Sequence, residues 1–134
     1  AETGHLVFST LHTNSAAQTI DRIIDSFPGP QQGQIRSQLA ATLVSIVSQR
    51  LVPRIEGGRI PAAEVMFINS AIRNLIRENK VYQIDLVIET SVQEGMATLN
   101  RSLAELVRRK EVTFDNAELY SPNPAELRVL LERM

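Results

Sequence analysis

The sequence predicts an α/β fold in which the tail of an α/β layer is followed by an all-helical segment. Leu6–Phe8 form a short apolar run that is typical of a buried strand. A polar turn at 11–14 stands where that strand would end, and residues 15–25 carry apolar side chains at helical spacing. A strand, a polar turn and a helix form the repeating unit of an α/β sheet, whose ligands bind beyond the carboxyl ends of the strands. Three residues are candidate caps for this helix: Thr13, Asn14 and Ser15.

Proline and glycine divide the next part of the chain. Phe27-Pro28-Gly29-Pro30 breaks the first helix, because proline fixes its own φ angle and disfavours helix in the residue before it. The apolar spacing then predicts one long amphipathic helix over residues 31–49. Gly57-Gly58 lies between the β-like runs 51–55 and 59–67, and this pattern predicts a β-hairpin.

Helical periodicity returns after the hairpin. Asn69 or Ser70 would cap a short helix over residues 71–78, whereas 81–90 are rich in strand formers and the pattern alone allows a strand there. A domain boundary is expected near Asn69, which divides the chain into residues 1–69 and 70–134. Further helices are predicted over residues 98–110, 113–119 and 125–134.

The composition excludes several classes of protein. The 134 residues carry 14 basic and 15 acidic side chains, a net charge of −1, whereas dedicated nucleic-acid binders show a basic excess, so no nucleic-acid partner is expected. Cysteine is absent, which rules out disulfides, thiolate metal sites and cysteine nucleophiles. No stretch approaches the roughly 18 apolar residues of a membrane span, and no signal peptide is recognised. A chain that opens inside a strand motif is most simply interpreted as a fragment of a longer protein.

Two stretches resemble motifs of one family. Residues 3–13, with Thr-Gly-His-Leu leading to Thr-Leu-His-Thr, resemble the His box of the secretion and type IV pilus ATPases. Residues 71–78 resemble the signature octapeptide of the PilT-type pilus retraction motors, and the similarity covers about residues 1–114. Ser9 departs from the family pattern, in which a glycine is common at this position. Residues 115–134 match no motif of the family. The octapeptide consists of Ala71, Ile72, Arg73, Asn74, Leu75, Ile76, Arg77 and Glu78.

The resemblance implies a fold and a function for the parent protein. The fold would be the C-terminal part of a RecA-like P-loop ATPase domain, followed by an all-helical C-terminal segment in which 81–90 are helical. The parent would be a cytoplasmic, hexameric motor, peripheral at the inner membrane, that uses ATP and Mg²⁺ to retract type IV pili in twitching motility. Its partners would be other copies of itself and the inner-membrane platform protein of the pilus machine. The phosphate-binding and Mg²⁺-binding motifs of this family precede the His box and are absent here, so we expect this chain alone to be inactive and to bind neither cofactor nor metal.

The two histidines receive different roles. Composition alone gives them none, and a shared metal ion is disfavoured, because positions seven apart on a strand face opposite sides. His12 falls at the carboxyl end of the predicted strand, where a phosphate would lie, and it is our candidate for sensing the γ-phosphate. His5 falls at the other end and is assigned a structural or subunit-coupling role. Thr10 and Thr13 would polarise or orient the same region.

The octapeptide allows two interpretations. By pattern alone it is a short surface helix with an apolar stripe of Ile72, Leu75 and Ile76. Arg73 and Arg77 are four residues apart and share a face. The resemblance instead implies a role in retraction rather than in nucleotide binding.

Two other functions remain open on the sequence. The chain could be a non-catalytic helical interaction module that keeps an ATPase-like sequence without the chemistry. It could also come from a pilus assembly or type II secretion ATPase that has lost the four-cysteine zinc insert of those enzymes. The direct passage from Gln49 to Glu64 through a Gly-Gly turn, without cysteine, favours the retraction branch.

Overall fold

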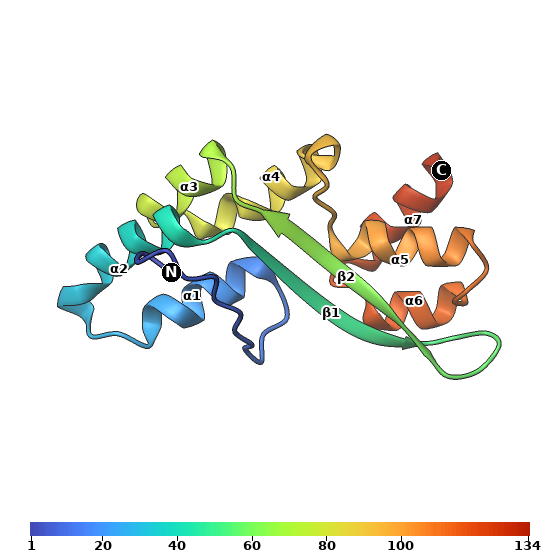
Figure 1. The fold of residues 1–134 in the computed structure, drawn as a ribbon. Helices are drawn as coiled ribbons and strands as arrows, with labels where there is room; N and C mark the ends of the chain where they lie inside the picture. Colours follow the sequence, from blue (N-terminus) through green and yellow to red (C-terminus); the bar gives the residue numbers. More distant parts are fainter.

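The computed structural model describes all residues from 1 to 134 and shows a mixed α/β fold with one two-stranded sheet (Figure 1). The helices are arranged along a long hairpin that crosses the molecule diagonally in this view. Helices α1 and α2 precede the hairpin, and α3 to α7 follow it. The elements are α1 (Ala16–Asp25), α2 (Gly29–Thr42), β1 (Ser45–Pro53), β2 (Arg59–Phe67), α3 (Ser70–Arg77), α4 (Ile84–Thr90), α5 (Leu99–Arg108), α6 (Phe114–Tyr120) and α7 (Pro124–Arg133), with short 3₁₀ turns at Val81–Gln83 and Val92–Glu94.

The hairpin confirms the Gly-Gly prediction and corrects the helix predicted before it. Gly57 and Gly58 have φ angles of 97° and 71°, which other residues rarely adopt, and they close the antiparallel pair of β1 and β2. The helix predicted over residues 31–49 is wrong beyond Thr42, because β1 starts at Ser45. The stretch 44–47 is rich in β-branched residues, which favour the pleated surface of a strand, and long-range pairing with β2 overrides the helical spacing.

The two edges of this sheet differ. On β2, Val65 exchanges two backbone hydrogen bonds with Ala97, and the backbone N–H of Ala63 donates to Ser102 Oγ at 3.0 Å. On β1, the backbone groups of Val47, Gln49 and Leu51 point away from β2 and have no partner. The edge of β2 is therefore closed at its centre, and the edge of β1 is open.

Two hydrophobic cores lie along the hairpin. The first is built around Met66 from α1, α2, α3 and α4, and the second is built around Val52 and Ala62 from α5, α6 and α7. The fully buried residues of the first core include Ile20, Ile24, Met66, Ile72, Ile76, Ile84 and Ile88, and those of the second include Val52, Ala62, Leu103, Ala117 and Leu127.

The helices after Asn69 confirm the predicted all-helical segment. The Asn69 side chain caps α3 by accepting a hydrogen bond from the Ile72 backbone N–H at 2.9 Å. Residues 81–90, for which the pattern allowed a strand, form a 3₁₀ turn followed by α4, as the family resemblance implied. None of these helices, nor those before the hairpin, is long and apolar enough to cross a membrane.

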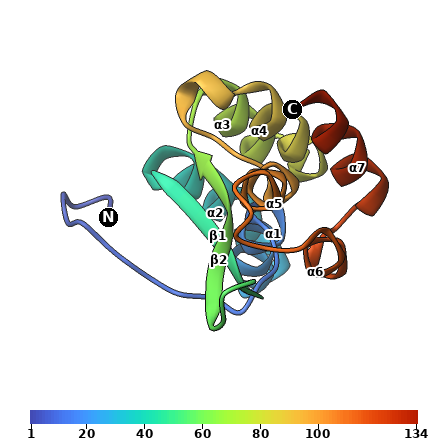
Figure 2. The ribbon, with the colours of Figure 1, turned by 90° about the vertical axis from the view of Figure 1, so that its right-hand side faces the viewer.

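The strand predicted from the apolar run Leu6–Phe8 is not formed. Residues 1–14 contain no helix or strand, and Leu6 and Phe8 are 80% and 89% exposed. Figure 2 shows the segment looping out from the hairpin on the side opposite α5 to α7, and its first residues return to α2, where Gln38 Nε2 donates a hydrogen bond to Glu2. A strand needs a neighbouring strand for its backbone hydrogen bonds, and this segment pairs with none, not even with the open edge of β1.

Candidate functional site

The polar turn that contains His12 leads directly into α1. Ser15 is the residue that caps this helix, accepting a hydrogen bond from the Gln18 backbone N–H at 3.1 Å. The hydroxyls of Thr13 and Thr19 lie 2.5 Å apart, and the backbone N–H of Asn14 donates to the side-chain oxygen of Gln18 at 2.6 Å. These bonds all run within the turn and the first turns of α1, so the turn is held to its own helix.

The predicted site residues His5, Thr10 and His12 are not brought together. His12 and Thr10 are exposed, and His12 makes no hydrogen bond within the chain. The His5 ring bonds through Nδ1 to the Thr3 hydroxyl at 2.9 Å rather than to His12 or Thr13. No group of three or more His, Asp or Glu side chains lies close enough to hold a metal ion. His12 is therefore free to meet a group from outside this chain, whereas His5 already has a local partner.

Glu64 is part of this site and was missed by the sequence analysis. It lies on β2 between the buried residues Ala62 and Met66, and its Oε1 accepts a hydrogen bond from the backbone N–H of Ala16 at 2.8 Å. Glu64 is only 9% exposed, and Ala16 is fully buried. The signal in the sequence was a carboxylate at an inward position of an alternating strand, which needs a partner when it is buried.

Burial raises the pKa of the Glu64 carboxyl above its ordinary value. The hydrogen bond from Ala16 opposes this rise, and the negative charge of Asp85 on α4 adds to it. The pKa of Asp85 is raised as well, first by burial and then by the charge of Glu126 on α7. Two carboxyl groups from different elements thus bind protons more readily in the folded chain than in the unfolded one.

These raised values give a pH dependence of stability. A carboxyl with a raised pKa holds its proton in the folded state at a pH where the unfolded chain has released it. Its stabilising contribution is therefore fully present below the ordinary value of 4.5 and is lost as the pH rises through the folded value. We expect the wild-type chain to lose stability relative to Glu64→Gln between pH 4.5 and neutral pH, measured by urea unfolding at each pH. Glu132→Gln, on an exposed side chain of α7, is the control, and an equal pH profile for Glu64→Gln and wild type would contradict the prediction.

The octapeptide forms α3, and the structure divides its residues into two groups. Ile72 and Ile76 are fully buried in the first core, and Leu75 packs half-buried against it. The Arg73 Nε donates to the Ala40 backbone oxygen of α2 at 3.1 Å, so this guanidinium is engaged within the fold. The exposed residues of the octapeptide are Ala71, Asn74, Arg77 and Glu78. Only these residues are available to a partner without unfolding the helix.

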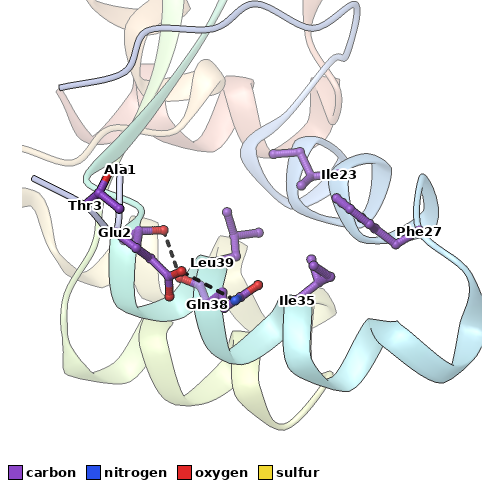
Figure 3. Close-up of a pocket in the computed structure, with 9 residues that line it drawn as sticks. Ala1, Glu2, Thr3, Ile23, Phe27, Ile35, Gln38 and Leu39 are labelled. Carbon is purple, nitrogen blue, oxygen red and sulfur yellow. Dashed lines mark hydrogen bonds between the residues drawn. The ribbon is translucent and has the colours of Figure 1, made fainter. Parts of the chain in front are cut away.

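A pocket lies elsewhere, between the start of the chain and the first two helices. It has a volume of about 390 Å³ and is lined by residues 1–3 together with side chains of α1 and α2 (Figure 3). The apolar part of its wall consists of Ile23, Phe27, Ile35 and Leu39, which lie on α1, on α2 and between them. None of the residues 9–15 lines the pocket. The pocket offers no cluster of cationic side chains for a phosphate, and it is separate from the turn that carries His12.

Comparison with known proteins defines the class. Residues 1–57 match the family described as type II/IV secretion system protein. The structure superposes with a TM-score of 0.84, at 48% identity, on the crystal structure of the pilus retraction motor PilT with bound ADP, and the match covers 100% of this chain and 36% of that one. The chain therefore belongs to the secretion ATPase family, and it corresponds to the C-terminal part of the ATPase domain with the helical segment that follows.

Within this family the chain is of the PilT type. It is 50% identical over 117 residues to the type IV pilus retraction ATPase PilT of Pseudomonas aeruginosa, a match that covers 87% of this chain and 34% of the relative. The type IV pilus assembly ATPase PilB of Thermus thermophilus is 46% identical over only 55 residues, 41% of this chain and 6% of the relative. The chain spans about a third of the length of the retraction ATPases that it matches.

Proposed function

We propose that the parent of this chain is a hexameric motor that couples ATP hydrolysis to the retraction of type IV pili, and so to twitching motility. The observation that carries the proposal is the extent of the similarity. It covers most of the chain for the retraction ATPase but less than half of it for the assembly ATPase. The absence of cysteine agrees with this choice, because the resemblance places a four-cysteine zinc insert in the assembly branch.

The cofactors, partners and location of the parent belong to the same proposal. The parent would bind ATP with Mg²⁺, using motifs that precede the His box, and the present chain alone would hydrolyse no ATP. It would act as a ring of identical subunits at the cytoplasmic side of the inner membrane, against the platform protein of the pilus machine. The division of the chain into 1–69 and 70–134 stays a prediction.

Deletion of the parent gene and an ATPase assay of the purified parent test this function together. A retraction motor should hydrolyse ATP, and its loss should leave cells that carry pili but do not twitch. Loss of the pili themselves would identify an assembly motor. A parent with no ATPase activity and no phosphate-binding loop would favour the non-catalytic interaction module.

Arg77 is the residue of α3 with which we test the retraction role. It is exposed and forms no hydrogen bond or ion pair within the chain, unlike Arg73. We expect Arg77→Ala to leave ATP binding within about twofold of the wild type and to reduce twitching about tenfold, because its guanidinium contacts a partner rather than the nucleotide. The measurements are nucleotide affinity of the parent and the rate of colony-edge expansion.

Arg133 provides the matched control, since it is an exposed arginine near the end of α7. Arg133→Ala should change neither quantity. Equal loss of ATP binding and twitching in Arg77→Ala would show that this residue supports the fold or the nucleotide site and would contradict the proposed role.

A further inference from the structure

We propose that Glu64 is a positioning residue that holds the turn carrying His12 against β2 and thereby connects this turn with α3. The inference rests on the proposed function, because it assigns His12 to the nucleotide. It starts from one contact, the hydrogen bond that the Glu64 carboxylate accepts from the Ala16 backbone N–H at 2.8 Å.

This contact satisfies a donor that nothing else in the chain satisfies. Ala16 is the first residue of α1, and the first N–H groups of a helix have no partner within the helix. The Ser15 cap serves the N–H of Gln18 instead. Because Ala16 is fully buried, water cannot replace the carboxylate without opening the structure. The negative charge also lies at the positive end of the helix dipole, where it is favoured.

Glu64 is the only residue of another element that is hydrogen-bonded to residues 9–16. The other bonds of this stretch run within it or to α1, such as Thr13 with Thr19 and Asn14 with Gln18. The segment before it, which includes Phe8, is exposed. The bond between Ala16 and Glu64 is therefore the one hydrogen bond that fixes the turn carrying His12 to the sheet, beside the packing of Ala16 and Ile20 in the first core.

On the other side, Glu64 lies on a strand that leads directly into α3. Residue 64 pairs with Ser48 of β1 in the centre of the hairpin, and β2 ends at Phe67. Asn69 follows and caps α3. The turn and the octapeptide, the two stretches with family motifs, are thus connected by a polar route through Glu64 and the end of β2, in addition to the first core that α1 and α3 share. A displacement of the turn pulls on β2 at Glu64, and β2 is continuous with the start of α3.

Kinetics of the parent protein test this role. We expect Glu64→Ala to lower kcat about tenfold with KM and nucleotide affinity within about twofold, because the His12 turn is misplaced while the phosphate-binding motifs are intact. Glu64→Gln should recover kcat to within about threefold of the wild type, since its side-chain oxygen can accept the same hydrogen bond. Glu132→Ala, on an exposed glutamate, should leave both constants unchanged.

Amide hydrogen exchange of the same proteins gives a readout that does not depend on activity. In Glu64→Ala, exchange over residues 12–19 should accelerate at least about tenfold, while exchange in α5 should stay as in the wild type. If the alanine variant does not fold, Glu64→Asp replaces it, because the shorter side chain keeps the charge but withdraws the carboxylate from Ala16.

The outcomes separate this inference from the proposed function. Unchanged exchange over residues 12–19, or faster exchange with an unchanged kcat, would overturn the role of Glu64. A wild-type parent without ATPase activity would overturn the proposed function, and the link from Glu64 to a nucleotide-sensing turn would fall with it. Faster local exchange in an active parent, a lower kcat at constant KM and recovery by glutamine would establish the positioning role.

Discussion

Replacing His12 by alanine in the parent protein is expected to lower the rate of ATP hydrolysis about 100-fold and to leave ATP binding within about twofold of the wild type. The imidazole is exposed at the start of the turn and has no partner in the chain, so its ring nitrogens are free to bond a phosphate oxygen. In the proposed sensing role, His12 would donate a hydrogen bond to the γ-phosphate that is made with ATP and lost with ADP, and this bond would contribute to the reaction and to the signal that follows. The measurements are kcat from phosphate release and affinity from titration with a non-hydrolysable ATP analogue.

His5→Ala is the informative comparison for this prediction. The His5 ring is bonded to Thr3, so its loss should disturb the segment before the turn and lower kcat much less than the loss of His12. An unchanged turnover in His12→Ala would contradict the sensing role. An equal loss of turnover and ATP affinity would mean that His12 binds the nucleotide without distinguishing its state.

Replacing Ile76 by alanine is expected to reduce the free energy of unfolding of the chain by about 3 kcal/mol, because it leaves a cavity in a fully buried position of the first core. Small domains are stable by about 5 to 15 kcal/mol, so this one change removes a large share. The loss should appear in urea unfolding as a lower midpoint with an unchanged slope.

Asn74→Ala on the exposed side of the same helix is the matched control, and it should stay within about 0.5 kcal/mol of the wild type. The comparison matters for any mutational study of the octapeptide. If the parent is the proposed motor, loss of its output after a change at Ile72 or Ile76 would report unfolding, whereas loss after a change at Arg77 with ATP binding kept would report a contact with a partner. A cost below about 1 kcal/mol for Ile76→Ala would show that α3 is not an integral part of the first core.

Local signals in the sequence predicted the parts of this fold that depend on neighbouring residues. Ser15 and Asn69 cap the helices that they precede, and Gly57-Gly58 closes the hairpin, because caps and tight turns are decided by a few adjacent side chains and φ angles. Signals of this kind do not describe partners that are distant along the chain. The helix predicted through Gln49 gave way to a strand that pairs with β2, and the apolar run at Leu6 formed no strand because it pairs with no other strand.

In the candidate site, too, the local motifs could be predicted and the contacts between distant residues could not. The motifs around His12 and α3 could be read from the sequence, but no pattern placed Glu64 beside Ala16, which precedes it by 48 positions. The structure also shows which octapeptide residues are buried and which are exposed, and the spacing of its apolar residues could not predict this for the two arginines. Arg73 and Arg77 share a helical face by periodicity, yet one is bonded to α2 and the other is exposed. Which of two equivalent positions meets the core depends on where the neighbouring helices pack.

Because the two edges of the hairpin differ, a further strand can be added to this sheet at one edge only. Any further strand must enter beside β1, at Val47, Gln49 and Leu51, because Ala97 and Ser102 occupy the centre of the other edge. Natural exposed edges are usually guarded by lysine, proline or a bulge, and this stretch of β1 carries none of these at its outward positions. Outside its parent, the chain therefore presents an open strand edge with which another copy can pair. A low protein concentration, or a charged side chain at this edge such as Val47→Lys, should keep the chain monomeric.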